Sequence, residues 1–229
     1  MHPLPTLKKL AFEPGVLFPI ANIFAFAQSG SLVAVGLAVV NVALAVAFTL
    51  GKKPPLSPMR LTALLALLSG LFSFASLAWL AGCAGLAFGT GNFLASSPSN
   101  MAALRAPGLH PCRRALAHPA IYYGIGYCLI GIMAGGSAEL LAHPLDHGQA
   151  LTMVILGAVT IVVASLGLAL GFMKTAIPFW ILACGTGINA LAGLVSGNYV
   201  GAGSPLFAMF GEVRLGFMTR EEPAETQAE

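Results

Sequence analysis

The chain has 229 residues, of which 57% are hydrophobic and only 8% charged, and its formal net charge is +3. A soluble domain of this size needs roughly 25% charged residues to cover its surface, so the composition excludes an ordinary water-soluble fold. The basic residues are spread over short segments rather than clustered, which argues against nucleic acid as a partner. We therefore expect a membrane protein whose main surroundings are the lipid bilayer.

Long apolar stretches between the charged residues predict transmembrane helices. The stretch 61–98 would form a straight helix of about 57 Å, almost twice the hydrocarbon thickness, so it must contain a turn. The glycines at Gly82 and Gly85 are the most permissive place for that turn. In the first half we expect helices over about 14–29, 31–50, 61–81 and 84–98.

The second half follows the same scheme, with expected helices over 119–136, 150–172 and 177–199 and a polar loop over 137–149. A last stretch, 202–217, is apolar except for Glu212 and Arg214, which we assign near its cytoplasmic end. If this stretch and 84–98 both cross the membrane, all 11 Lys and Arg residues fall on one side, as the positive-inside rule requires.

These assignments predict an all-α polytopic membrane protein with about eight transmembrane helices and both termini in the cytoplasm. Residues 1–218 would form one transmembrane domain in a bacterial inner membrane, and the acidic tail 219–229 would be disordered. The alternative has seven spans and an amphipathic C-terminal helix.

An internal repeat is visible between the halves 12–104 and 115–218. The segment from Phe12 to Asn22 aligns with the segment from Ala117 to Tyr127, with a Pro at the third position of each. An even number of spans in each half makes the halves parallel, so the sequence predicts a 4+4 repeat about an axis along the membrane normal.

Uncharged polar residues are the candidates for a solute path. No expected span holds Lys, Asp or Glu at its middle, which weakens ion coupling because intramembrane ionisable groups usually carry it. Interhelical hydrogen bonding is the simpler role for the polar residues that remain. The candidates for lining a path are Asn22, Gln28, Asn41, Asn92, Tyr127, Thr186 and Asn189.

Metal, cofactor and catalytic signals are weak or missing. His143, Asp146 and His147 are metal donors in one loop, but a structural zinc site usually needs four donors, so we expect no metal and no cofactor. The sequence contains no GxSxG, HExxH, P-loop or dinucleotide motif, so we do not expect an enzyme. His110 and His118 flank a pair of arginines, where we expect contact with anionic headgroups.

Two functions fit these features. The first is a transporter or permease for a small uncharged or amphiphilic solute, which should enclose a polar site near mid-membrane. The second is a non-catalytic membrane subunit or assembly factor of a larger inner-membrane complex. Glycine-rich faces such as Gly131–Gly135 and Gly193–Gly197 would then pack against homo- or hetero-oligomeric partners.

Overall fold

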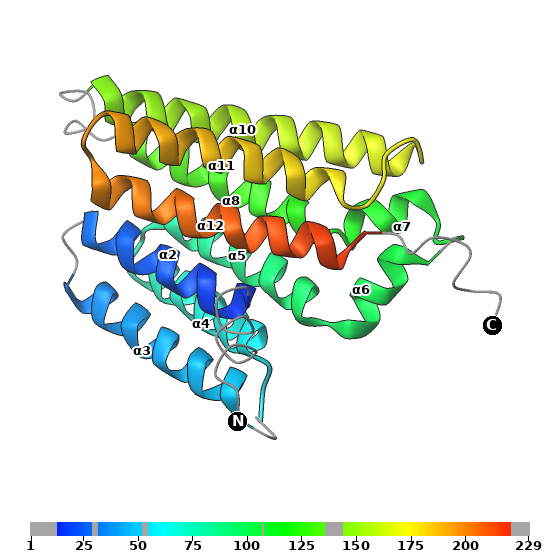
Figure 1. The fold of residues 1–229 in the computed structure, drawn as a ribbon, viewed down its shortest axis with the longest axis horizontal. Coiled ribbons are helices and arrows are strands. Elements are labelled where there is room, and N and C mark those ends of the chain that lie inside the picture. The colour runs from blue at the N-terminus through cyan, green and yellow to red at the C-terminus, as the bar shows by residue number, and fades with distance from the viewer. Residues whose placement is uncertain (1–12, 29–31, 52–54, 107, 136–143, 221–229) are drawn as a thin grey trace, which may run out of the picture.

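The computed structural model describes residues 13–28, 32–51, 55–106, 108–135 and 144–220, and these residues form a bundle of long helices (Figure 1). The predicted all-α class is confirmed over these ranges. The helices are α2 (Pro14–Gln28), α3 (Leu32–Leu50), α4 (Pro58–Ala75), α5 (Trp79–Ser96), α6 (Pro98–Arg105), α7 (Pro111–Leu116), α8 (Pro119–Gly135), α10 (Pro144–Ala169), α11 (Ile177–Val195) and α12 (Tyr199–Met218).

Four helices are long and apolar enough to cross a membrane: α3, α4, the Gly148–Ala169 part of α10, and α11. Large apolar side chains cover much of the outside, and Leu32 and Val195 are 84% and 81% exposed. Exposed apolar area on this scale is unfavourable in water and is typical of a surface that faces lipid. The chain therefore has the properties of a membrane protein.

The turn in the stretch 61–98 lies earlier than predicted. The break at Gly82 and Gly85 is wrong, because the chain turns at Ser76–Ala78 with Leu77 at φ 60°. Gly85 lies inside α5, where a Cβ atom would come within 2.7 Å of the Gly70 Cα on α4. The small residues allow two helices to pack closely instead of ending one.

Other boundaries also differ from the prediction. The short helices α6 and α7, which each begin with a proline at the first helical position, lie between the expected helices 84–98 and 119–136. Helix α10 begins at Pro144, inside the expected polar loop, and α12 begins at Tyr199.

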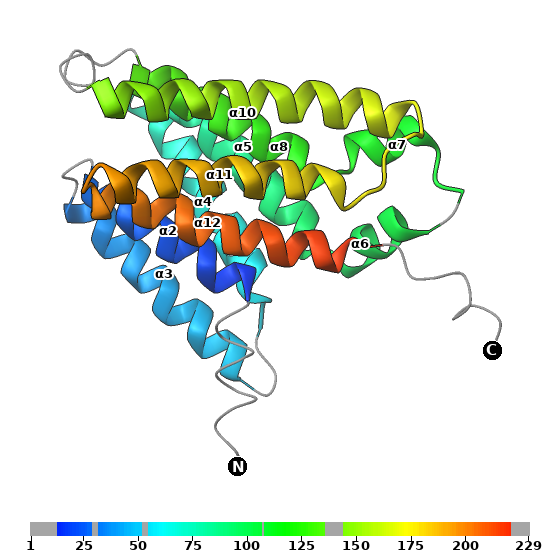
Figure 2. The same cartoon turned by 45° about the horizontal axis from the view of Figure 1, so that its top comes forward.

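Helix packing follows one scheme in both halves. In the first half α2 packs on α3, α3 on α4 and α4 on α5; in the second α8 packs on α10, α10 on α11 and α11 on α12. Between the halves, α5 packs on α8 and α12 packs on α2 (Figure 2). Each half therefore contributes its first and last helices to the contact with the other.

The two ends of the bundle differ in charge. Helices α4 and α11 end where α5 and α12 begin, at the end opposite the short helices α6 and α7 (Figure 1). The described Lys and Arg residues all lie toward the end that carries α6 and α7: Arg60, Arg105, Arg113, Arg114, Lys174, Arg214 and Arg220.

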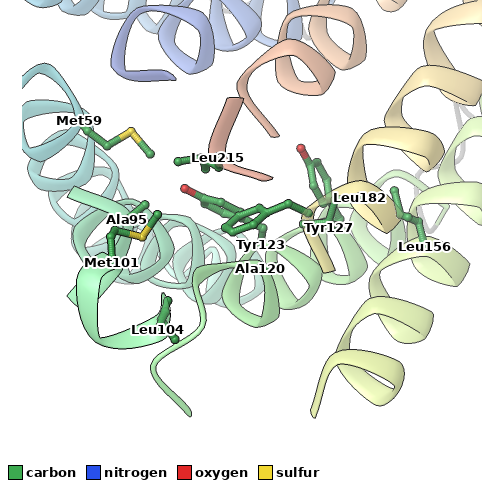
Figure 3. Close-up of a cluster of buried hydrophobic side chains, with 11 residues drawn as sticks. Met59, Ala95, Met101, Leu104, Ala120, Tyr123, Tyr127, Leu156, Leu182 and Leu215 are labelled. Carbon is green, nitrogen blue, oxygen red and sulfur yellow. The ribbon is translucent and has the colours of Figure 1, made fainter. Parts of the chain in front are cut away.

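A buried cluster joins the two halves and surrounds the site described next (Figure 3). Met59 and Ala95 come from the first half, and Leu182 and Leu215 come from the second. Two tyrosines, Tyr123 and Tyr127, project from α8 into this cluster. The apolar packing therefore encloses polar groups between the halves.

Candidate functional site

A carboxyl group lies buried between α8, α11 and α12. The Glu212 side chain of α12 is fully buried, with 0% of its surface exposed. Its Oε1 accepts a hydrogen bond of 2.6 Å from the Tyr127 hydroxyl, and its Oε2 accepts one of 2.7 Å from the Thr186 hydroxyl. Both oxygens of the carboxyl group are therefore hydrogen-bonded.

Glu212 lies level with the middle of the helices that bind it. Tyr127 is the ninth of the 17 residues of α8, and Thr186 is the tenth of the 19 residues of α11. The prediction that no acidic group lies at mid-depth is therefore wrong for this bundle. Glu212 lies in the C-terminal half of its own helix, α12, which is why the sequence assigned it to the end of a span. Its depth in the bundle depends instead on where α12 packs against α8 and α11.

A second polar pair extends the cluster toward the first half. The Tyr123 hydroxyl, one turn before Tyr127 on α8, donates a 2.8 Å hydrogen bond to the Oδ1 of Asn92 on α5, which is buried. The Phe88 ring lies against both tyrosines, with centroid distances of 6.3 Å to Tyr123 and 5.3 Å to Tyr127. The cluster therefore draws polar groups from both halves.

Asn189 lies one turn from Thr186 on the same side of α11. Its side chain is buried, and its Nδ2 has no hydrogen-bond partner among the described residues. The Gln149 side chain of α10, which is partly buried, donates a 3.4 Å hydrogen bond to the backbone oxygen of Asn189. A buried amide donor normally has an acceptor, so the Asn189 Nδ2 leaves one hydrogen bond at the edge of this cluster unmade.

The other candidate residues lie away from this cluster or cannot be placed. Asn22 is exposed on α2. Asn41 is buried on α3, and its Oδ1 has no partner among the described residues. The side chain of Gln28 lies outside the described part of the chain. Of the seven candidates, the structure brings together Asn92, Tyr127, Thr186 and Asn189, and it adds Tyr123 and Glu212.

The candidate metal donors His143, Asp146 and His147 cannot be assessed, because their side chains lie outside the described residues. Within the part of the chain that is described, no three His, Cys, Asp or Glu residues form a group that could hold a metal ion.

His118 is an interior residue, so the prediction that it contacts headgroups is wrong. Its ring is fully buried, its Nδ1 accepts from the Ala120 N–H at 3.3 Å, and its Nε2 therefore donates to the Thr175 carbonyl at 2.7 Å. The Thr175 hydroxyl in turn donates to the Thr219 carbonyl at 2.8 Å. Burial lowers the pKa of His118 to about 4, although the hydrogen bond to Thr175 opposes this shift.

The arrangement around Glu212 offers a buried carboxyl group and several hydrogen-bonding groups for a polar ligand. One sequence signal could have located it: Gly91-Asn92 and Gly211-Glu212 are glycine-polar pairs 120 positions apart. Comparison with known proteins adds no assignment, because no family model, curated protein or solved structure matches this chain.

Proposed function

We propose that the protein is an integral membrane transporter that moves a small uncharged or amphiphilic solute between two four-helix halves. The observation that carries this proposal is the buried polar cluster, to which α5 contributes Asn92 and the second half contributes Tyr123, Tyr127, Thr186 and Glu212. Repeat-built transporters hold their substrate sites near the midplane, between the repeats.

The internal repeat is supported by two turns with matching geometry. Leu77 and Gly197, 120 positions apart, both have positive φ, at 60° and 77°. The hydrogen bonds around them correspond: Ala78 N–H donates to Ser73 at 2.8 Å, and Asn198 N–H donates to Gly193 at 2.9 Å. The turn between α4 and α5 thus has the same design as the turn between α11 and α12.

The contacts between the halves support the same relation. A Cβ atom on Gly91 would come within 2.7 Å of the Tyr123 ring, and one on Gly211 would come within 2.9 Å of the Phe18 ring. Phe18 and Tyr123 hold equivalent places in the aligned segments at the start of α2 and α8, and their ring centroids lie 5.5 Å apart. We place the axis of the 4+4 repeat at this pair of rings.

The proposed topology has eight spans, with α2, α5, α8 and α12 crossing in addition to the four longer apolar helices. The distribution of the described Lys and Arg residues toward the end that carries α6 and α7 supports a cytoplasmic location for that end. Both termini then lie on the cytoplasmic side of a bacterial inner membrane.

The test is solute flux through the purified full-length chain in liposomes, followed by stopped-flow light scattering with glycerol, urea and glucose as probes. We expect at least one probe to enter faster than in protein-free liposomes, and we expect Asn92→Leu to reduce that rate at least tenfold. The control is Ser69→Leu, because Ser69 is exposed on α4. Equal rates with and without protein for all three probes would contradict the proposal.

The second candidate, a membrane subunit, is favoured by the exposed amide of Asn22. An Asn on the outer face of an apolar helix gains stability from a hydrogen bond to a partner helix, worth about 1 kcal/mol. Purification from native membranes in mild detergent tests this role. A stoichiometric partner that is lost in Asn22→Leu would favour the subunit over the transporter.

A further inference from the structure

The hydrogen bonds around Glu212 can accommodate two states of its carboxyl group. Among the described residues its partners are two hydroxyl groups, and no Lys, Arg or His forms an ion pair with it. The charge of a buried carboxylate is therefore not compensated by a fixed cation. Uptake of one proton from water converts it to the neutral acid without changing any other charge.

Thr186 supplies the means of changing between these states. Its Oγ1 lies 2.7 Å from Glu212 Oε2 and 2.9 Å from the Leu182 carbonyl oxygen. With a charged carboxylate, the Thr186 hydroxyl donates to Glu212. With a neutral acid, the Glu212 O–H donates to Thr186 Oγ1, and the Thr186 hydroxyl rotates to donate to Leu182. A single hydroxyl rotation, which costs little, therefore satisfies both states.

Polar groups connect Glu212 with one end of the bundle. Asn189 lies one turn, about 4.5 Å along the α11 axis, beyond Thr186. Gln149 contacts the backbone of Asn189 and is only partly buried, near the end of the bundle where α10 begins. The Nδ2 of Asn189 has no hydrogen-bond partner among the described residues, so it can donate to a water molecule on this route.

Apolar side chains surround Glu212 in the opposite direction. Toward α6, the described cluster contains Met59, Ala95, Met101 and Leu104, with Leu215 one turn beyond Glu212 on α12 (Figure 3). These side chains offer no hydrogen-bonding group to carry a proton. A hollow of about 310 Å³ at this end is lined by Ala95, Met101 and Met218, and the apolar side chains of the cluster lie between it and Glu212. A proton path of polar groups therefore runs toward Gln149 and not toward α6.

Among the described residues that face Glu212, no other side chain is a carboxylic acid. The titratable groups that face it are Tyr127 and Tyr123 from α8. Helix α11 faces it with Thr186, and α2 packs the Phe18 ring against the adjacent Gly211. Arg214, on α12 itself, is exposed.

We propose that Glu212 binds the coupling proton of the transporter, and that the proton reaches it from the α10 end of the bundle by way of Gln149, Asn189 and Thr186. The proposal rests on the proposed function, because it names the ion that would drive solute movement. It replaces the sequence-based expectation that the chain lacks a group for ion coupling.

The experiment is infrared difference spectroscopy of the full-length protein in liposomes, which records protonation without a solute. We expect a carboxylic acid band that titrates with pH, is absent in Glu212→Gln and is shifted in Glu212→Asp. The aspartate variant keeps the carboxyl group and serves if the glutamine variant does not fold. A titrating band that is identical in the wild type and in a folded Glu212→Gln would overturn the proposal.

The path is tested by the rate at which this band shifts after transfer to heavy water. We expect Asn189→Leu to slow the exchange at least tenfold and Ser69→Leu to leave it unchanged. Ser69 is the matched control, because it lies 120 positions before Asn189 and is exposed. Exchange in Asn189→Leu as fast as in the wild type would overturn the path.

Proton flux separates this proposal from the proposed function. Liposomes loaded with a pH-sensitive dye should acidify when the probe solute moves with wild-type protein, and they should not acidify with Glu212→Gln. Solute movement without acidification in the wild type would overturn the coupling and leave the transporter intact. A titrating Glu212 band without movement of any probe solute would overturn the transporter and leave the proton site intact.

Discussion

Helices α5 and α12 occupy equivalent places at the two contacts between the halves, but the polar residues that they carry differ in chemistry. Asn92 on α5 is a neutral amide with one hydroxyl donor, Tyr123. Glu212, 120 positions later on α12, is a carboxyl group with two hydroxyl donors. The positions that correspond to Tyr127 and Thr186 in the first half are Asn22 and Ala66. Asn22 is exposed and alanine has no hydrogen-bonding group, so only the second half places two buried donors around this position.

The largest effect should come from placing a carboxyl group in the first half. Asn92→Asp leaves a buried acidic group with Tyr123 as its single donor, so we expect a loss of about 3–5 kcal/mol. Thermal unfolding of the detergent-solubilised protein measures this loss, with Glu212→Gln as the comparison. An Asn92→Asp protein as stable as the wild type would mean that the two sites are chemically interchangeable.

The buried ring of His118 provides the next test. The pKa of His118 is lowered by burial to about 4, so the unfolded chain takes up a proton below about pH 6.5 while the folded protein does not. The free energy of unfolding therefore has its full value above about pH 6.5. About 3 kcal/mol of it is lost as the pH falls toward 4.

Chemical denaturation at a series of pH values between these limits measures this slope. The control is His118→Gln, which should lose the slope, because glutamine has no proton to bind in this range. A slope that persists unchanged in the variant would assign the pH dependence to other groups.

The two tyrosines of α8 test whether the hydrogen bond to Glu212 stabilises the protein more than the hydrogen bond to Asn92 does. Tyr127→Phe removes one of two donors from a carboxyl group and should cost about 2 kcal/mol, whereas Tyr123→Phe should cost about 1 kcal/mol. Phenylalanine preserves the ring contacts with Phe88 in both variants. Equal losses in unfolding free energy would remove the distinction between the amide and carboxyl sites.

The smallest effects should appear at the equivalent turns. Leu77 has a left-handed backbone and a largely exposed side chain, so Leu77→Gly should stabilise the protein by about 0.5 kcal/mol. Gly197→Ala should destabilise it by about 1 kcal/mol, since open space surrounds the position and only the backbone resists a Cβ atom. Melting temperatures that move the same way for both variants would count against the shared turn geometry.

The sequence predicted the helices better than the site. Low charge and long apolar stretches were sufficient for the all-α class and for most helix boundaries, because both depend on local composition. The turn at Leu77 was missed because a leucine occupies a conformation usually left to glycine, while the nearby glycines serve helix packing.

Glu212 was missed for a different reason. Its depth depends on how far α12 slides along α8 and α11, and hydropathy along one chain segment carries no information on that displacement. Asn92, Tyr127, Thr186 and Asn189 were recognised as polar residues in apolar helices. Their meeting around a carboxyl group could be found only when the helices were packed together.

The short helices α6 and α7 have a topological consequence. They connect the halves at one end of the bundle, so in the eight-span arrangement each half enters and leaves the membrane on the same side. Insertion of the second half then does not depend on its being fused to the first. Chains 1–106 and 108–229, produced as separate polypeptides in one cell, should each insert with the same orientation and assemble through the α5–α8 and α12–α2 contacts.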